Sequence, residues 1–101
     1  MIVERLTFQA KFGQGDTITQ AFKEFNEKFA PRYGVTGRLL VDVTGPMFTV
    51  VAETEYRDMA HVAETEAGMQ AAFADSEWQG WFAAWQGAVT SGSRELLRVV
   101  A

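Results

Sequence analysis

Hydrophobic and polar residues alternate along four segments of the chain, which is the pattern of a β-strand with one buried face. The first segment spans residues 2–12, the middle two span 37–44 and 47–56, and the last spans 95–100. A Gly45-Pro46 pair separates the middle two segments, which predicts a hairpin with a tight connection. The pattern therefore predicts four strands, the middle two of which are neighbours.

The first helical region follows a Gly13-Gln14-Gly15 turn and has apolar residues at spacings of three and four. These apolar residues are Ile18, Ala21, Phe22, Phe25 and Phe29. Asp16 or Thr17 caps the start of the predicted helix, and Thr17 with Gln20 fits a capping box. Pro31 and Gly34 end the helix.

The second helical region is less regular and has two parts. Asp58 is a suitable N-cap for the first part. Its apolar stripe consists of Met59, Val62, Ala63, Met69 and Phe73. Asp75 or Ser76 starts the second part, which has a stronger helical pattern and ends at Ser91-Gly92-Ser93. The apolar residues of this second part are Trp78, Trp81, Phe82, Trp85 and Val89.

The predicted order of elements is β-α-β-β-α-β, the arrangement of the ferredoxin-like α+β fold, and residues 1–101 fit one such domain. Right-handed crossovers place both helices on one face of a four-stranded antiparallel sheet. We expect the covered face to carry Leu6, Phe8, Leu39, Val41, Phe48, Val50, Leu97 and Val99. We expect the open face to carry Leu40, Val51 and Leu96 among Arg5, Thr7, Arg38, Asp42, Glu53 and Arg98.

The open face combines aliphatic side chains with charges of both signs in near-matching numbers. Left bare, it exposes a broad apolar surface, whereas under a partner sheet its charges need partners. This mixture suits a partly hydrated space between two sheets, so we predict a homodimer that forms through the open face. The alternative is a solvated sheet face with extended arginine side chains, because antiparallel sheets often face water on one side.

The composition narrows the classes of function. The chain is 48% hydrophobic and 13% aromatic, which is typical of a globular domain. Its net charge is −4 and its nine Lys and Arg are scattered, so we expect no nucleic-acid partner. No apolar run approaches the roughly 18 residues of a membrane span, so we expect no membrane partner. The lack of cysteine excludes disulfides and thiolate sites and fits a cytoplasmic location.

A pattern of short motifs covers nearly the whole chain: Ala30 to Gly34, Gly37 and Gly45 around the second predicted strand, Val51 to Asp58, and Asp75 to Trp78. It resembles the dimeric α/β-barrel superfamily, in particular its NIPSNAP-like and antibiotic-biosynthesis-monooxygenase-like groups. The resemblance implies a homodimeric barrel of two sheets packed face to face. Members of the superfamily include cofactor-independent oxygenases, haem-degrading enzymes, isomerases and cyclases, so the fold does not by itself give the reaction.

Five residues are candidates for a site between the helices and the sheet. His61, the single histidine, and Arg98 are the candidate catalytic groups. Tyr33, Trp78 and Trp81 are candidate walls of a pocket for a flat ligand. The alternatives are that His61 is an ordinary helix residue and that the tryptophans belong wholly to the core.

We therefore predict a small-molecule-binding homodimer that acts as a cofactor-independent oxygenase, isomerase or cyclase on a flat hydrophobic substrate. A non-catalytic dimeric module is the alternative. A cavity lined by indole rings and by His61, Tyr33 or Arg98 would favour the first hypothesis, and a fully packed helix–sheet interface would contradict it.

We expect no metal, because one histidine with scattered carboxylates lacks ligand spacing, and no other cofactor. Haem binding is a third hypothesis. By the same resemblance, haem-degrading relatives use an Asn on the first strand, a Trp, and a His that follows that Trp. Here the first strand has Gln9 instead, and His61 precedes every Trp.

Overall fold

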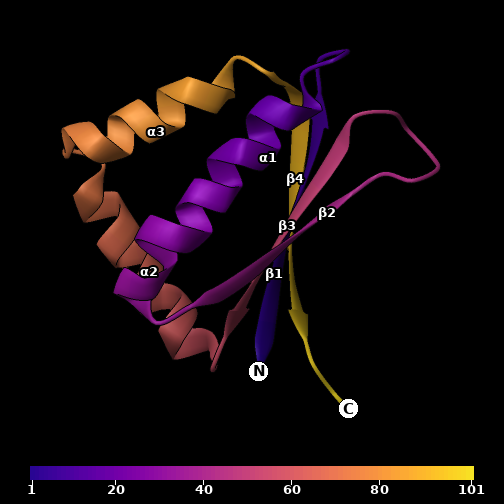
Figure 1. Ribbon diagram of the computed structural model, residues 1–101. Coiled ribbons are helices and arrows are strands. Elements are labelled where there is room, and N and C mark those ends of the chain that lie inside the picture. Colours follow the sequence, from indigo (N-terminus) through magenta and orange to yellow (C-terminus); the bar gives the residue numbers. More distant parts are fainter.

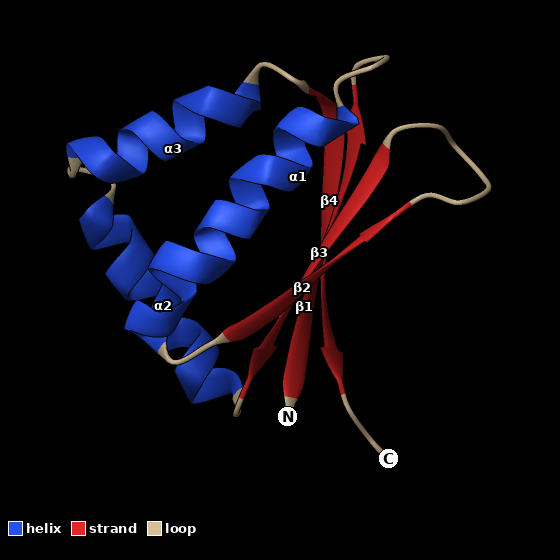
Figure 2. Ribbon diagram, in the orientation of Figure 1, coloured by secondary structure: helices blue, strands red, loops and turns tan.

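The computed structural model describes residues 1–101 as a four-stranded sheet with helices on one face (Figures 1 and 2). The elements are β1 (Ile2–Ala10), α1 (Gly15–Glu24), β2 (Thr36–Val41), β3 (Thr49–Tyr56), α2 (Met59–Ala72), α3 (Ser76–Gln86) and β4 (Val89–Arg98). A π-helical turn (Phe25–Phe29) and a 3-10 turn (Ala30–Tyr33) extend α1. The strands pair antiparallel in the order β2-β3-β1-β4. The predicted ferredoxin-like α+β fold is confirmed.

The three helices lie on one side of the sheet, and no element covers the other side (Figure 2). Helix α1 runs across the sheet, whereas α2 and α3 lie farther out and α3 packs on α1 (Figure 1). The predicted second helical region is two helices, because the chain turns sharply before α3, where Asp75 caps the new helix. No helix has the length and apolar character needed to cross a membrane.

The core lies between α1 and the sheet and is strongly aromatic. Every apolar residue predicted for the first helix is buried, namely Ile18, Ala21, Phe22, Phe25 and Phe29. The Phe22 ring lies 5.4 Å from the Phe8 ring of β1 and 5.1 Å from the Trp85 ring of α3, measured between centroids. Burial of such large rings supplies much of the stability of a small domain.

The start of α1 differs from the prediction. The helix begins at Gly15, so Thr17 lies inside it and forms no capping box. Gly13, with φ of 77°, and a hydrogen bond from the Gln14 N–H to the Lys11 carbonyl oxygen form a tight turn that leads directly into the helix. At the other end Pro31 is accommodated in the 3-10 turn, and Gly34, with φ of 64°, ends the helical segment as predicted.

The connection between β2 and β3 is longer than the predicted Gly-Pro turn and spans residues 42–48. Its ends are joined by two bonds, from the Asp42 N–H to the Thr49 carbonyl oxygen and from the Thr49 N–H to Asp42 Oδ1. The side chain of Asp42 thus helps to hold the two ends of this longer loop together. Val43, which falls within the predicted strand over residues 37–44, is 95% exposed in this loop.

The last strand is also longer than predicted, since β4 begins at Val89 and includes the Ser91-Gly92-Ser93 segment. Gly92 lies opposite Phe8, and a Cβ at this position would approach the Phe8 ring to 3.2 Å. The absence of a side chain at Gly92 therefore leaves room for the Phe8 ring beside this edge strand. The glycine does not end a helix, contrary to the prediction from the sequence.

The two faces of β4 are the reverse of the prediction. Leu96 pairs with Glu4 and Arg98 pairs with Ile2, on the helix-covered face, whereas Leu97 pairs with Val3 on the open face. The predicted face assignments of β1 and β3 hold, because Leu6 and Phe8 line the space beside the helices and Val50 and Ala52 are buried. Nothing in the short alternating sequence of β4 distinguishes its two faces, since both carry apolar and polar residues.

The Asp58 cap of α2 is confirmed, because its Oδ1 accepts a hydrogen bond from the His61 N–H over 2.9 Å. The apolar stripe predicted for α2 is wrong in part: Met59, Ala63 and Phe73 are exposed, whereas Val62 is buried. The other fully buried residues of the helix are polar, namely His61 and Thr65. Both have hydrogen-bond partners, which removes the cost of burying them.

Candidate functional site

A space of about 190 Å³ opens between the sheet and the outer helices α2 and α3, and we call it the aromatic cleft. Its lining residues are Glu4, Leu6, Phe8, Phe22, Phe25, Thr54, Tyr56, Met69, Phe73, Trp78, Trp81, Phe82 and Trp85. An apolar cavity of about 150 Å³ is large enough to bind benzene, so the aromatic cleft has room for a ring compound. Phe73 and Phe82 are partly exposed at its rim.

Two of the three tryptophans are fixed by hydrogen bonds from their indole N–H groups. Trp81 Nε1 donates to the carbonyl oxygen of Ala21 in α1 over 2.6 Å, and Trp78 Nε1 donates to that of Met69 in α2 over 3.0 Å. The Trp78 and Trp81 rings are stacked, with centroids 4.8 Å apart. They therefore form a rigid wall of the aromatic cleft.

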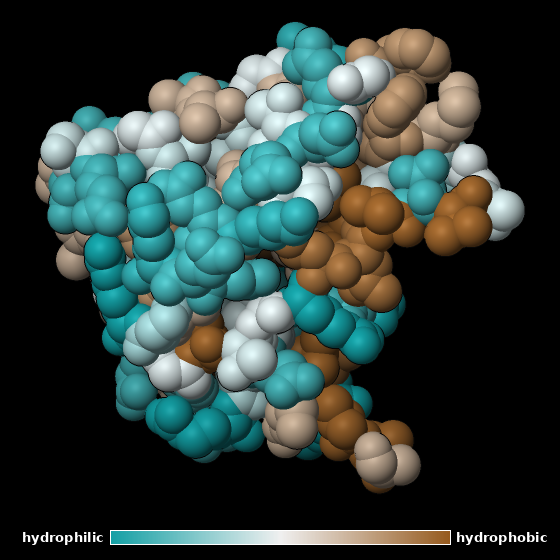
Figure 3. All heavy atoms as spheres, viewed as in Figure 1, coloured by the Kyte–Doolittle hydropathy of each residue, from teal (hydrophilic) through white to brown (hydrophobic).

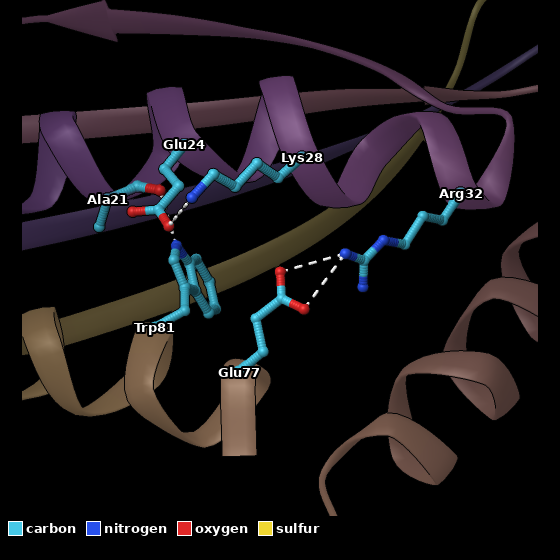
Figure 4. A network of polar contacts seen from close by, with 6 residues as sticks. All are labelled: Ala21, Glu24, Lys28, Arg32, Glu77 and Trp81. Atoms are coloured by element: carbon cyan, nitrogen blue, oxygen red, sulfur yellow. Dashed lines mark hydrogen bonds and ion pairs between the residues drawn. The ribbon is translucent and has the colours of Figure 1, made fainter. Parts of the chain in front are cut away.

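Figure 4 shows the seam between α1 and α3 that holds this wall in place. Trp81 points at Ala21, and next to it Arg32 Nη2 lies 3.1 Å and 3.3 Å from the two carboxylate oxygens of Glu77. The Arg32–Glu77 pair is half exposed, and such surface pairs contribute little to stability. The indole bond and the aromatic packing are therefore the main contacts that set the position of α3.

Trp85 differs from the other two tryptophans. Its Nε1 is the single buried side-chain nitrogen or oxygen atom without a hydrogen-bond partner in the chain. Its ring packs edge-on against Phe8 and Phe82, with both centroids 5.3 Å away. The aromatic stripe of α3 is thus both a core contact and a wall of the aromatic cleft, so the two interpretations of the stripe hold together.

The polar groups of the aromatic cleft gather at one end of it. Glu4 of β1 lies directly opposite Thr54 of β3, and Tyr56 follows on the same face of β3. Burial, and after it the nearby Glu4 carboxylate, raises the pKa of Tyr56 to about 12. At neutral pH Tyr56 is therefore a neutral phenol that can donate a hydrogen bond.

Arg94 of β4 connects this end of the aromatic cleft to α2. Its Nε donates to Glu4 Oε2 over 2.7 Å, and its Nη2 donates to the carboxylate of Glu66. One guanidinium thus serves two carboxylates, and Glu4 Oε1 is left without a partner from the chain. The Glu4 side chain is 13% exposed.

His61 lies outside the aromatic cleft, and both of its ring nitrogens are bonded to the backbone. Nδ1 accepts a hydrogen bond from the Arg57 N–H over 3.1 Å, and Nε2 lies 2.8 Å from the Tyr33 carbonyl oxygen, to which it donates. These bonds define a neutral ring with its proton on Nε2. Neither nitrogen is left for a base or for an iron ligand, so we assign His61 a structural role in joining α2 to the 3-10 turn.

The other predicted site residues divide into two groups. Trp78 and Trp81 lie together in the aromatic cleft, whereas Tyr33 and Arg98 do not line it. The Tyr33 ring packs over Gly68 of α2, so closely that a Cβ on Gly68 would approach it to 2.9 Å. Arg98 is exposed at the end of β4. The cavity is thus lined by indole rings as predicted, but with other polar residues than those predicted.

Glu4 and Tyr56 are the residues that the sequence interpretation missed. Glu4 has the same phase in the alternation as Leu6 and Phe8, and a carboxylate at a core-facing position is a signal for a site. Tyr56 is in phase with Val50 and Ala52 at the end of the third predicted strand. The alternation pattern contains both signals. That the two residues lie close together depends on the register of the strands, which the pattern does not give.

The open face carries a closed cluster of charges. Glu53, 6% exposed, receives a 2.7 Å bond from Arg5 Nε of β1 and another from Arg38 of β2. These hydrogen bonds, first that from Arg5 and then that from Arg38, lower the pKa of Glu53 below its usual value. Around this cluster Leu40 and Leu97 remain 40% and 38% exposed.

The chain is similar in architecture to solved structures of two named groups. A NIPSNAP family protein from Agrobacterium tumefaciens is 20% identical, with 98% of this chain and 92% of that chain covered, at a TM-score of 0.79. A NIPSNAP domain protein from Burkholderia xenovorans is 20% identical, with 100% and 96% covered, at 0.77. A candidate antibiotic biosynthesis monooxygenase from Nitrosomonas europaea is 12% identical over all of both chains, at 0.74.

No protein-family model matches the chain, and no curated protein is significantly similar to it. The predicted resemblance to NIPSNAP-like and monooxygenase-like proteins is confirmed by these structural neighbours. Because their identities to this chain are low, the likeness establishes the fold and leaves the reaction open.

Proposed function

We propose that the protein is a homodimer that binds a flat, hydrophobic small molecule in the aromatic cleft. The observation that supports this most strongly is the cleft itself, in which aromatic rings surround a space of about 190 Å³ and polar groups gather at one end. Small-molecule sites are typically concave and mostly apolar, with a few polar groups that fix the orientation of the ligand.

The reaction that this cleft would support best is a proton transfer, as in an isomerase or cyclase. Glu4 and Tyr56 are the groups in the cleft that can exchange protons, one as a carboxylate and the other as a neutral phenol. The alternative, a cofactor-independent oxygenase, draws its support from the neighbour described as a candidate antibiotic biosynthesis monooxygenase.

The homodimer is supported by the apolar surface that the sheet leaves uncovered. Leu40 and Leu97 are exposed on the open face. At the far end of the hairpin a second group of exposed apolar residues comprises Phe12, Val43 and Met47. Figure 3 shows hydrophobic atoms concentrated on the side of the molecule away from the helices, along the sheet and the β2–β3 loop. Such surface is typical of an interface between subunits.

Titration with 2-(hydroxymethyl)naphthalene, followed by ¹H–¹⁵N NMR, tests the binding proposal. Binding in the cleft will shift the indole N–H signals of Trp78, Trp81 and Trp85. Replacing Met69 by Trp fills the cleft and should abolish these shifts, whereas Gln70→Trp, on the exposed side of α2, is the matched control. Unchanged indole signals at millimolar ligand would contradict the proposal and favour a non-catalytic dimeric module.

A further inference from the structure

The polar end of the aromatic cleft is lined by one charged side chain, and that side chain is a carboxylate. It belongs to Glu4, which is 13% exposed and lies beside the neutral Tyr56 and Thr54. Arg94 bonds to both Glu4 and Glu66, so its positive charge is divided between two carboxylates. Glu66 and Arg98 are exposed and do not line the cleft, so water screens the charges of both. The charge that faces the cleft is therefore negative.

A hydrogen-bond acceptor is available at the same place. Arg94 Nε bonds to Glu4 Oε2, which leaves Glu4 Oε1 for another donor. The hydroxyl oxygens of Thr54 and Tyr56 lie on the neighbouring strand and also accept hydrogen bonds. An ammonium group has three donors and no acceptor, so three oxygen atoms of this kind match it. A carboxylate ligand would meet the Glu4 charge instead and be repelled.

The aromatic walls of the cleft also favour a positively charged ligand. The faces of aromatic rings attract cations, tryptophan most strongly, and the cleft is lined by three tryptophans. Glu4 and Phe8 lie on the same face of β1 four residues apart, which is about 13 Å along a strand. A ligand with its polar group at Glu4 can therefore extend one or two rings toward Phe8 and Trp85.

Resting on the proposed function, we infer that the ligand of the aromatic cleft is a planar hydrophobic amine in its protonated form, with its ammonium group bound to Glu4. Three matched probes test this: 2-(aminomethyl)naphthalene as the cation, 2-(hydroxymethyl)naphthalene as the neutral compound and 2-naphthoate as the anion. They share the naphthalene ring and differ in charge. Calorimetry at low salt gives their affinities, and the indole N–H signals report binding in the cleft.

The expected order of affinity is amine, then alcohol, then carboxylate. A charge-assisted hydrogen bond predicts that the amine binds about 10-fold to 100-fold more tightly than the alcohol. In Glu4→Gln this ratio should fall to about 3-fold or less, because Arg94 keeps its bond to Glu66 while the cleft loses its charge. Glu64→Gln, an exposed position of α2 outside the cleft, is the control that should keep the wild-type ratio.

The outcomes separate the inference from the proposed function. If the alcohol binds as tightly as the amine in the wild type, the inference is overturned while the aromatic cleft remains a binding site. A ratio that survives Glu4→Gln also overturns it, because the charge preference then arises elsewhere. If none of the probes shifts the indole signals, the proposed function fails and the inference fails with it. The comparison of probes in the wild type decides the matter even if Glu4→Gln does not fold.

Discussion

The two faces of the sheet each place a carboxylate beside arginine, in opposite ratios. On the open face Glu53 is alone between Arg5 and Arg38, with bonds of 2.7 Å from both. On the covered face Glu4 and Glu66 share Arg94. The first cluster has one carboxylate and two guanidiniums, and the second has the reverse.

This difference separates a structural cluster from a candidate site. Both Glu53 oxygens have an arginine partner, so the group ties three neighbouring strands together and has no free acceptor. Glu4 keeps one oxygen free and faces a space lined by rings. Buried charge is tolerated where its bonds are complete, and an incomplete set beside a cavity indicates a place for a ligand.

The largest expected effect comes from placing a charge on the open face. Leu40→Asp puts an unpaired carboxylate among the apolar residues that the proposed dimer buries, which should weaken association by 100-fold or more. Sedimentation velocity at micromolar concentration measures this directly. The control is Ala67→Asp, an exposed position of α2. A monomeric wild type, or a Leu40→Asp protein with unchanged mass, would refute the interface.

Removal of the His61 imidazole tests the structural role of this residue, which joins α2 to the 3-10 turn. His61→Phe leaves the Arg57 N–H and the Tyr33 carbonyl oxygen without their partner, at a cost of about 3 kcal/mol in unfolding free energy. Urea denaturation measures the loss, with Glu64→Gln as the control. The same variant tests haem binding, since a hemin absorption change that depends on His61 would contradict the structural role.

Neutralising Glu53 should have a smaller effect, because both arginines remain partly exposed to water. We expect Glu53→Gln to lower the unfolding free energy by about 1–2 kcal/mol at pH 7. The pKa of Glu53 is lowered in the folded state, so its stabilisation is complete above about pH 4.5 and is lost as the pH falls through the lowered value.

Thermal unfolding between pH 7 and pH 2 measures this dependence on pH. The wild type should lose more stability on acidification than Glu53→Gln, which has no group to protonate at this position. Glu55→Gln, on the same strand but without an ion pair, is the control and should follow the wild type. Parallel curves for all three proteins would show that the two arginines do not bind Glu53 tightly in solution.

The sequence predicts those parts of the fold in which periodicity is strong. Strict spacing in the first helix identifies its buried face, and alternation identifies the inward residues of β1 and β3. The prediction fails in β4, because Ser91-Gly92-Ser93 has the composition of a turn. The Phe8 ring that makes the glycine necessary belongs to a strand that is far away in the sequence. The prediction fails also in α2, where buried His61 and Thr65 are polar and depend on tertiary bonds.

The candidate site is less predictable than the fold, for the same reason. Trp78 and Trp81 are identified by their helical spacing, which brings them to one wall. His61 was attractive as the single histidine, but its two backbone partners lie on other turns of the chain and are invisible in the pattern. The polar end arises from strand register, which pairs Glu4 with Thr54 and brings Arg94 next to them.

The effect that is smallest at pH 7 concerns Tyr56, which joins the core of the covered face to its polar end. Its pKa is raised to about 12 in the folded state from an ordinary value of 10.0, so the folded chain holds this proton more tightly. Stability from the neutral phenol is complete below pH 10 and is lost as the pH rises from 10 toward 12.

Tyr56→Phe cannot ionise in this interval, so its unfolding free energy should fall less between pH 10 and pH 12 than that of the wild type. The two proteins should differ little at pH 7. Tyr33→Phe, which leaves Tyr56 in place, should retain the wild-type dependence on pH. If Tyr56→Phe and the wild type lose stability in parallel above pH 10, the phenol is solvated, and the polar end of the aromatic cleft is open to water instead of being shielded for a ligand.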